Sequence, residues 1–203
     1  KGEKLMKGKF RVGLAIGGVV LLCGLGEVFG APLLTKDKAL ERMLPGVEEV
    51  IKETKTLSVD QKNLIEKEVG SKTMGDSYTF YMGKSKGETT GVALILVEEG
   101  KHNKITTIVG LDPDGKVKDV AVMAHQEKRS KQALESTRWF KQFIGKTSKD
   151  PFVVGKDIDS ITKATVSSVA VTTAVKKAVI LYDVLYLQCE TAKAADEAAP
   201  AAK

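Results

Sequence analysis

Three short apolar runs separated by turn sequences constrain the fold of this chain more than any other feature. The runs are residues 92–97, 105–111 and 117–123, and the sequence DPDG at 112–115 separates the last two. Apolar runs of this length, bounded by glycine and other turn residues, are typical of β-strands. Pro, Asp and Gly favour tight turns, and short connections join antiparallel neighbours. The sequence therefore predicts an antiparallel meander.

Helical signals lie on both sides of the meander. The segments 35–46 and 58–70 each open on a Thr or Ser that can cap a helix and end at glycine, and residues 132–143 are expected to form a short helix. A long final helix is expected over 165–188, because its apolar residues recur at spacings of three and four. With a β-prone segment at 78–82, the pattern predicts an α+β fold of one antiparallel sheet with flanking helices.

The N-terminal region combines a basic cluster with a long apolar segment. Residues 1–11 hold five Lys or Arg and one Glu, and residues 12–26 contain no charged side chain. After Glu27 the apolar stretch continues to Leu34. A helix over 12–34 spans about 34 Å, enough to cross a hydrocarbon core of roughly 30 Å. The sequence thus predicts a single N-terminal transmembrane helix before the α+β domain, with the N-terminus in the cytoplasm and the remainder outside it.

A cleaved signal peptide is the competing interpretation, because the small residues Gly30 and Ala31 follow the apolar run. Pro32 directly after them disfavours cleavage at that point. With an uncleaved anchor, the predicted location is the cytoplasmic (inner) membrane, single-pass, with the C-terminal domain on the periplasmic side. The predicted segments are a cytoplasmic basic segment at 1–11, a transmembrane anchor at 12–34, a helical and linker region at 35–90, a main domain at 91–190 and a disordered Ala-rich tail at 191–203.

The composition argues against several kinds of site. Two cysteines, Cys23 and Cys189, and two histidines, His102 and His125, do not suit a disulfide framework, a thiolate zinc site or a multi-histidine metal site. The net charge is +6, but much of the basic excess lies in the first eleven residues and no nucleic-acid-binding motif accompanies it. We therefore expect neither a metal ion nor a nucleic-acid partner.

The segment with the most chemical information is the sequence DIDSITKATVSS at 157–168, which leads into the expected final helix. Its two acidic and five hydroxyl side chains are typical of a helix N-terminus, where they accept hydrogen bonds from main-chain N–H groups without a partner. The same N–H groups and the helix dipole attract an anion such as phosphate. The residues alone are compatible with a simple cap and with a phosphate site.

Within this segment, DSITKAT at 159–165 resembles D-x-x-[S/T]-G-A-[T/S], the flavinylation motif of FMN-binding domains. That family includes the G-type component of the Rnf electron-transport complex and the C-type component of the sodium-pumping NADH:quinone reductase. The strand-turn-strand at 110–122 and the block WFKQFIGK at 139–146 also resemble the family, so the likeness covers roughly 91–185. It implies that the main domain is an FMN-binding domain.

The resemblance also implies a covalent cofactor. In the family, the last Thr of the motif carries FMN through a phosphoester bond that a separate flavin transferase makes from FAD, and by position this residue is Thr165. The other expected cofactor-binding residues surround it: Asp159, Ser160, Thr162, Lys163, Ala164 and Ser167. Lys163 stands where the family usually has glycine. If the position needs a positive φ, lysine is strained there, whereas in a helical conformation it fits and adds a cation beside the phosphate.

Three residues outside the motif are additional candidates for flavin contact, namely His125, Trp139 and Phe140. His125 either contacts the flavin ring or is a hydrogen-bonded structural histidine. Trp139 and Phe140 either form a wall against the isoalloxazine ring or belong to the core, as aromatic residues at helical spacing commonly do. No catalytic residue is predicted.

The resulting hypothesis is a membrane-anchored extracytoplasmic flavoprotein that relays electrons through FMN on Thr165. Its expected partners are membrane redox complex subunits or other electron carriers, with the flavin transferase needed for maturation, and it acts as an electron-transfer subunit and not as a stand-alone enzyme. Two alternatives are compatible with the same sequence. One is a membrane-tethered assembly module without flavin, and the other is a sensor domain that binds free FMN or a lipid-like ligand.

Overall fold

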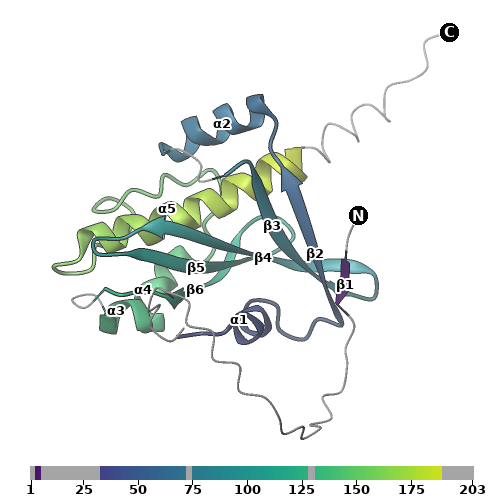
Figure 1. Ribbon diagram of the computed structural model, residues 1–203, viewed down its shortest axis with the longest axis horizontal. Coiled ribbons are helices and arrows are strands. Elements are labelled where there is room, and N and C mark those ends of the chain that lie inside the picture. Colours follow the sequence, from purple (N-terminus) through teal and green to yellow (C-terminus); the bar gives the residue numbers. More distant parts are fainter. Residues whose placement is uncertain (1–2, 6–32, 72–74, 128–130, 189–203) are drawn as a thin grey trace, which may run out of the picture.

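An antiparallel sheet forms the centre of the computed structural model, which describes residues 3–5, 33–71, 75–127 and 131–188 (Figure 1). The strands lie side by side in the order of the sequence, and each is antiparallel to the next. They are β1 (Glu3–Leu5), β2 (Glu49–Thr56), β3 (Ser77–Ser85), β4 (Glu88–Glu99), β5 (Lys104–Leu111) and β6 (Val117–Ala124). The predicted meander corresponds to β4, β5 and β6, and the β-prone segment to β3, so both predictions are confirmed.

Strand β2 lies in a segment for which the sequence indicates no element. In its sequence EVIKETKT, half-buried residues alternate with exposed ones from Ile51 onward, and the half-buried ones include charged side chains. The strand lies between β3 and the three-residue strand β1. Lys and Glu are depleted in strands in general, so propensity does not reveal this one. Strand β4 runs from Glu88 to Glu99 and therefore crosses the predicted boundary between the linker region at 35–90 and the main domain at 91–190.

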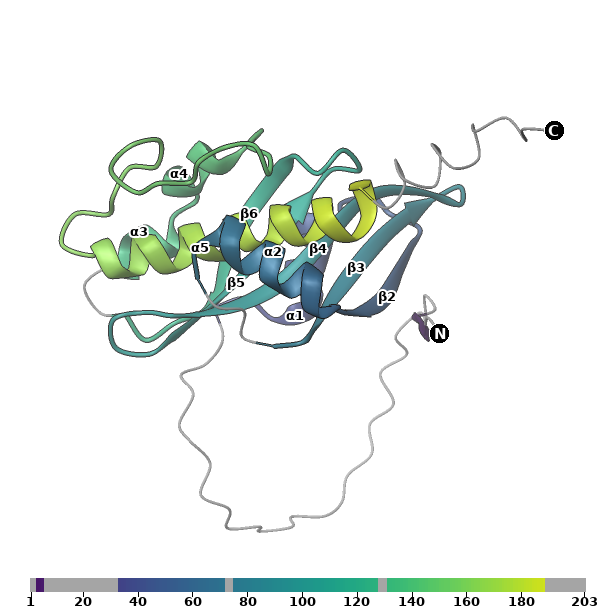
Figure 2. The same ribbon diagram turned by 90° about the horizontal axis from the view of Figure 1, so that it is seen from above.

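Helices cover both faces of the sheet (Figure 2). Helices α5 (Thr165–Tyr182) and α2 (Val59–Val69) lie on one face, and α1 (Lys36–Met43) lies on the other. A π-helical turn, η2 (Asp183–Leu187), extends α5. The predicted starts are confirmed: α2 follows a capping box made by Ser58 and Gln61, and α5 begins at Thr165.

The helix predicted over residues 132–143 is broken into three pieces, so that prediction is wrong in its continuity. The pieces are α3 (Lys131–Glu135), α4 (Thr137–Phe140) and the 3-10 turn η1 (Lys141–Phe143). Ser136 separates the first two in an extended conformation, with φ −93° and ψ 132°, and its hydroxyl accepts from the N–H of Arg138. The chain turns at Ser136 because this hydroxyl starts a new helix there.

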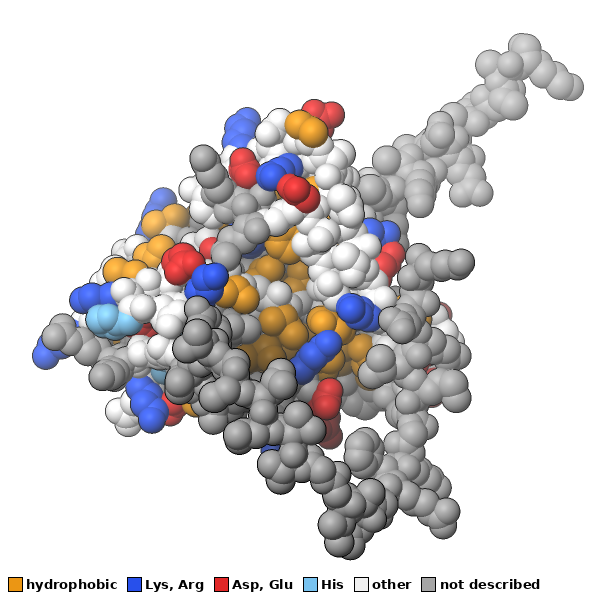
Figure 3. All heavy atoms as spheres, viewed as in Figure 1, with side chains coloured by type: hydrophobic (Ala, Val, Ile, Leu, Met, Phe, Trp, Pro, Cys, Tyr) orange, Lys and Arg blue, Asp and Glu red, His pale blue; other side chains and the backbone are white. Residues whose placement is uncertain are grey.

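The sheet separates two apolar cores. The larger core packs α5 and α2 against residues such as Phe80, Leu94 and Leu111, and the smaller one packs α1 against Ile108 and its neighbours. Of the 18 residues of α5, 13 are buried, which makes it the central support of the domain. In the space-filling view, hydrophobic side chains show at the centre of the face, and charged side chains of both signs lie around them (Figure 3).

Most of the predicted transmembrane anchor at 12–34 lies outside the described residues, as does the predicted tail at 191–203. The N–H groups of Leu33 and Leu34 both donate to the carbonyl oxygen of Met123 in β6, at 2.9 and 3.3 Å. Within the described part of the chain, no helix combines the length and the apolar character needed to cross a membrane.

Candidate cofactor site

The motif at 159–165 forms a bent loop that leads directly into α5. The N–H of Ala164 donates to the carbonyl oxygen of Ile161 at 2.9 Å, which closes a turn over Thr162 and Lys163. Lys163 has a φ of 62°, in the left-handed region. Of the two conformations considered for this position, the structure has the one in which a side chain is strained and glycine is not. Thr162 and Lys163 are both exposed to solvent.

The loop is fastened from the helix side by a serine that the sequence did not single out. Ser168 is fully buried, and its Oγ accepts from the N–H of Ile161 at 2.8 Å and donates to the carbonyl oxygen of Ala164 at 3.1 Å. The N-cap of α5 differs from the simple side-chain cap that was one of the two interpretations of this segment. The N-cap residue is Ala164, which is buried and makes no side-chain cap. The sequence signal for the role of Ser168 in holding the loop is its position as a polar residue on the buried face of the helix.

Thr165, the predicted acceptor, is the first residue of α5 and is exposed. The hydroxyl of Ser160 donates to Thr165 Oγ1 at 3.4 Å, so these two predicted site residues meet. Val166 and Val169 beside it are 48% and 47% exposed, although both are large apolar residues. The outward side of the first turn of α5 therefore presents a hydroxyl next to apolar surface, at the end of a helix whose first N–H groups have no intrahelical partner.

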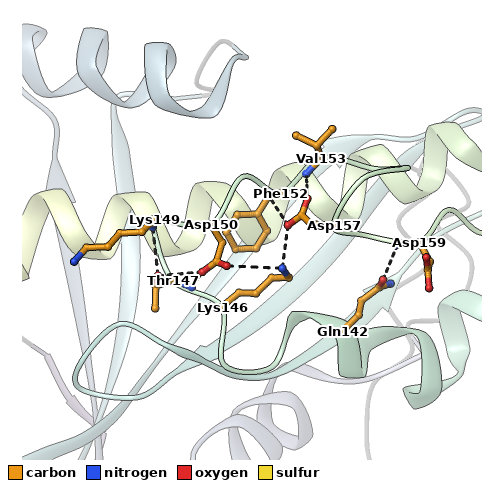
Figure 4. Close-up of polar contacts among 9 residues, drawn as sticks. All are labelled: Gln142, Lys146, Thr147, Lys149, Asp150, Phe152, Val153, Asp157 and Asp159. Atoms are coloured by element: carbon orange, nitrogen blue, oxygen red, sulfur yellow. Dashed lines mark hydrogen bonds and ion pairs between the residues drawn. The ribbon is translucent and has the colours of Figure 1, made fainter.

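Trp139 meets the first residue of the motif. Its indole N–H donates to the carbonyl oxygen of Asp159 at 2.8 Å. Gln142 completes the contact: its Oε1 accepts from the N–H of Asp159 at 2.7 Å (Figure 4), and its Nε2 donates to the carbonyl oxygen of Trp139 at 2.9 Å. A hollow of about 320 Å³ lies here, lined by Ala133, Ser136, Arg138, Trp139, Gln142 and Asp159.

The aromatic candidates divide between this hollow and the core. Trp139 is half-buried, and its ring makes edge-on contacts with Phe140 and Phe143, with centroids 5.4 and 5.2 Å apart. Phe140 and Phe143 are both buried in the main core. Trp139 is therefore the member of this cluster that lines the hollow, and Phe140 packs against the Trp139 ring from the core.

Asp157 holds the loop that precedes the motif. Its carboxylate accepts from the N–H groups of Val153 and Phe152 at 2.6 and 3.2 Å, and from Lys146 Nζ at 2.9 Å (Figure 4). Burial alone raises the pKa of Asp157, but the hydrogen bonds from Val153 and Lys146 outweigh it and lower this pKa below its ordinary value. Phe152, whose N–H is one of these donors, has a φ of 51°, so the clamp includes a residue in the left-handed region.

Ser167 and His125 lie on the other side of the helix end. The Ser167 hydroxyl is buried and donates to Glu127 Oε2 at 3.2 Å, so this predicted cofactor residue points away from the exposed side. His125 Nδ1 accepts from the N–H of Glu127 at 3.0 Å, which puts the ring proton on Nε2. Burial lowers the pKa of His125, although the nearby Glu135 carboxylate, 3.8 Å from Nε2, acts in the opposite direction. His125 is thus neutral near pH 7.

The structure therefore gathers Asp159, Ser160, Thr165 and Trp139 at one place, with Thr162 and Lys163 in the exposed turn between them. Gln142, Asp157, Glu127 and Ser168 support this arrangement, and the sequence did not identify them as site residues. In the described part of the chain, no group of three or more His, Cys, Asp or Glu side chains could hold a metal ion.

Comparisons with known proteins match this region. Residues 100–180 match the family model described as FMN-binding domain. The G-type component of the ion-translocating oxidoreductase complex of Aliivibrio fischeri is 35% identical over 129 residues, which are 55% of this chain and 61% of that protein. The G-type component of the Na⁺-translocating ferredoxin:NAD⁺ oxidoreductase complex of Acetobacterium woodii is 28% identical over 127 residues, 58% of this chain and 61% of that protein. The match spans about three fifths of the length of these relatives.

Among solved structures, a crystal structure of Shewanella oneidensis NqrC is similar, with a TM-score of 0.48 and 19% identity over 74% of each chain. The matched family segment runs from the turn between β4 and β5 through most of α5 and contains the whole motif with Thr165. The resemblance found in the motif is thereby confirmed: residues 100–180, which include the whole motif, match the FMN-binding domain family.

Proposed function

We propose that this protein is an electron-transfer subunit that carries FMN on the hydroxyl of Thr165 in phosphoester linkage. The observation that carries the proposal is the exposed Thr165 hydroxyl at the first residue of α5, inside the segment that matches the FMN-binding domain family. The relatives are described as subunits of ion-translocating oxidoreductase complexes, and this supports membrane redox subunits as its partners.

Attachment requires one reacting group from this chain. Thr165 Oγ1 attacks the FMN phosphorus of FAD; the new phosphoester bond forms as the pyrophosphate bond breaks, AMP leaves, and the hydroxyl proton passes to a base of the flavin transferase. The residues present fit a phosphate, because the first N–H groups and the dipole of α5 stabilise an anion at this end. Lys163, exposed two residues before the acceptor, adds a cation.

The surroundings of Thr165 also fit the flavin ring. Val166 and Val169 give it exposed apolar surface. Asp159 lines the hollow beside Trp139, and the next residue, Ser160, donates a hydrogen bond to Thr165. FMN supplies the one- or two-electron chemistry, while the protein attaches it, orients it and tunes its potential.

The anchor at 12–34 with the basic segment 1–11 before it supports an inner-membrane protein whose C-terminal domain lies on the periplasmic side. Covalent attachment suits that location, because a dissociated cofactor would be lost from the cell. These assignments of span and side are part of the proposal, and a protease-accessibility assay on spheroplasts tests them.

The attachment is tested by coexpression with a flavin transferase, followed by unfolding and removal of small molecules. We expect yellow protein whose intact mass has increased by FMN minus one water. Thr165→Ala should remove this addition, whereas Thr165→Ser and the control Thr172→Val, at a buried threonine of α5 outside the motif, should keep it. Flavin that leaves on unfolding would instead indicate non-covalent binding, and the absence of flavin would indicate an assembly module.

A further inference from the structure

We propose that Glu127 is a positioning residue for the FMN acceptor: its buried carboxylate holds the first turn of α5 against the turn between β4 and β5, and so sets how Thr165 is presented. This inference rests on the proposed function. Glu127 lies 38 residues before Thr165 in the sequence, in the segment that follows β6.

Glu127 is 4% exposed, and among the described residues it is the only Asp or Glu that is buried. A buried carboxylate is unfavourable unless hydrogen bonds compensate for the lost water. Here three donors do so: the N–H groups of His102, at 2.9 Å, and Lys101, and the hydroxyl of Ser167, at 3.2 Å. Burial raises the pKa of Glu127, but these hydrogen bonds outweigh it and lower the pKa, so the group is ionised at neutral pH.

The turn between β4 and β5 is shaped around this carboxylate. A Cβ on Gly100 would lie 2.6 Å from Glu127 Oε1 and 2.6 Å from the carbonyl oxygen of Asn103. Only glycine allows the main chain to come this close. The N–H of Gly100 in turn donates to Asn103 O at 2.9 Å, which closes the turn. The carboxylate therefore lies directly against the main chain of this turn.

Ser167 links the Glu127 carboxylate to the helical turn that carries Thr165. It is two residues after Thr165, in the same helical turn, and successive residues of an α-helix are about 100° apart, so the two side chains lie on nearly opposite sides. The structure agrees, because Thr165 is exposed and Ser167 is buried. Ser168, the next residue, is bonded to Ile161 and Ala164 in the motif loop. Two adjacent serines thus fix both the rotation of the helix end and the path of the loop.

The chain offers a matched set of variants. Ser167→Ala removes the hydroxyl that Glu127 holds and leaves a good helix former. Glu127→Ala removes the whole clamp, and Glu127→Gln keeps an oxygen for His102 and an amide that can donate to Ser167. Thr172→Val is the control, because the Thr172 hydroxyl is also buried on α5 but has no hydrogen-bond partner among the described residues.

The test is the initial rate of flavin transfer from FAD, with purified transferase and a range of concentrations of each variant. We expect Ser167→Ala and Glu127→Ala to lower the rate at saturating acceptor protein roughly tenfold, with little change in KM, because the hydroxyl is misaligned and binding is not lost. Glu127→Gln should lose less, and Thr172→Val should match the wild type. Circular dichroism at the assay temperature shows whether each variant is folded. If these residues only stabilised the fold, the folded variants would transfer flavin at the wild-type rate.

Equal saturated rates for wild type, Ser167→Ala and Glu127→Gln would overturn the positioning role even if Glu127→Ala fails to fold. A wild-type protein that takes up no flavin would overturn the proposed function itself. A loss seen equally in Thr172→Val would also overturn the inference, because any buried change in α5 would then have the same effect.

Discussion

The indole N–H of Trp139 donates a hydrogen bond to the main-chain carbonyl oxygen of Asp159, and this 2.8 Å contact joins the aromatic cluster to the first residue of the cofactor motif. Trp139 rests edge-on against two buried phenylalanines of the main core. The motif loop is thus attached to the main apolar core, although twenty residues separate the two partners.

Trp139→Phe should keep the ring contacts and lose this bond. We expect the free energy of unfolding to fall by about 1 kcal/mol, the usual net contribution of a neutral hydrogen bond. Because Trp139 is the only tryptophan, urea unfolding should be followed by circular dichroism. An unchanged midpoint and slope would show that water replaces the bond without cost.

Asp157 should make the domain sensitive to acid. Its folded-state pKa is lowered by the hydrogen bonds from Val153 and Lys146, so the carboxylate stabilises the fold above its unfolded pKa of about 4. This stabilisation is lost as the pH falls toward the folded-state pKa. Asp157→Asn should lower stability at pH 7 by about 2 kcal/mol and should flatten the decline below pH 4. Parallel acid-dependence of wild type and variant would contradict this assignment.

Lys163→Gly should stabilise the protein, because glycine adopts the observed φ of 62° without strain. We expect a gain of up to about 1 kcal/mol, reduced by the greater freedom of glycine in the unfolded chain. Lys163→Ala, the control, removes the same cation but keeps the strained backbone, and it should give no gain. Thermal unfolding of the three proteins decides the matter, and equal gains from both variants would point to charge instead.

The ion pair between buried Lys177 of α5 and half-buried Glu98 of β4 should tolerate loss of both partners better than loss of one. Lys177 is 1% exposed, and Glu98 is largely covered. Lys177→Met leaves Glu98 without its cation and should cost about 3 kcal/mol, whereas Lys177→Met with Glu98→Leu should lie within about 1 kcal/mol of wild type. Additive losses in the double variant, measured by urea unfolding, would exclude this coupling.

Elements with strong local signals were predicted from the sequence, and those decided by their neighbours were not. Strands β4 to β6 follow from apolar runs between turn residues, and α2 follows from a possible cap at Ser58 and a glycine at 70. Strand β2 was missed because its charged residues favour other structures until β3 pairs with it. The break at Ser136 was missed because residues 132–143 carry helical spacing on both sides of it.

The candidate site divides in the same way. The motif and its acceptor Thr165 can be read from the order of the residues, and so can the two conformations open to Lys163. Its positive φ was decided by the turn that Ala164 and Ile161 close.

The meander, the start of α5 and the hydroxyl at that start are predictable from local sequence, because each depends on residues a few positions apart. The side of α5 that faces outward and the contacts that hold its first turn depend on the folded protein. Ser167 and Glu127 are 40 residues apart in the chain, and their hydrogen bond exists only after the sheet has brought the end of β6 beside the helix.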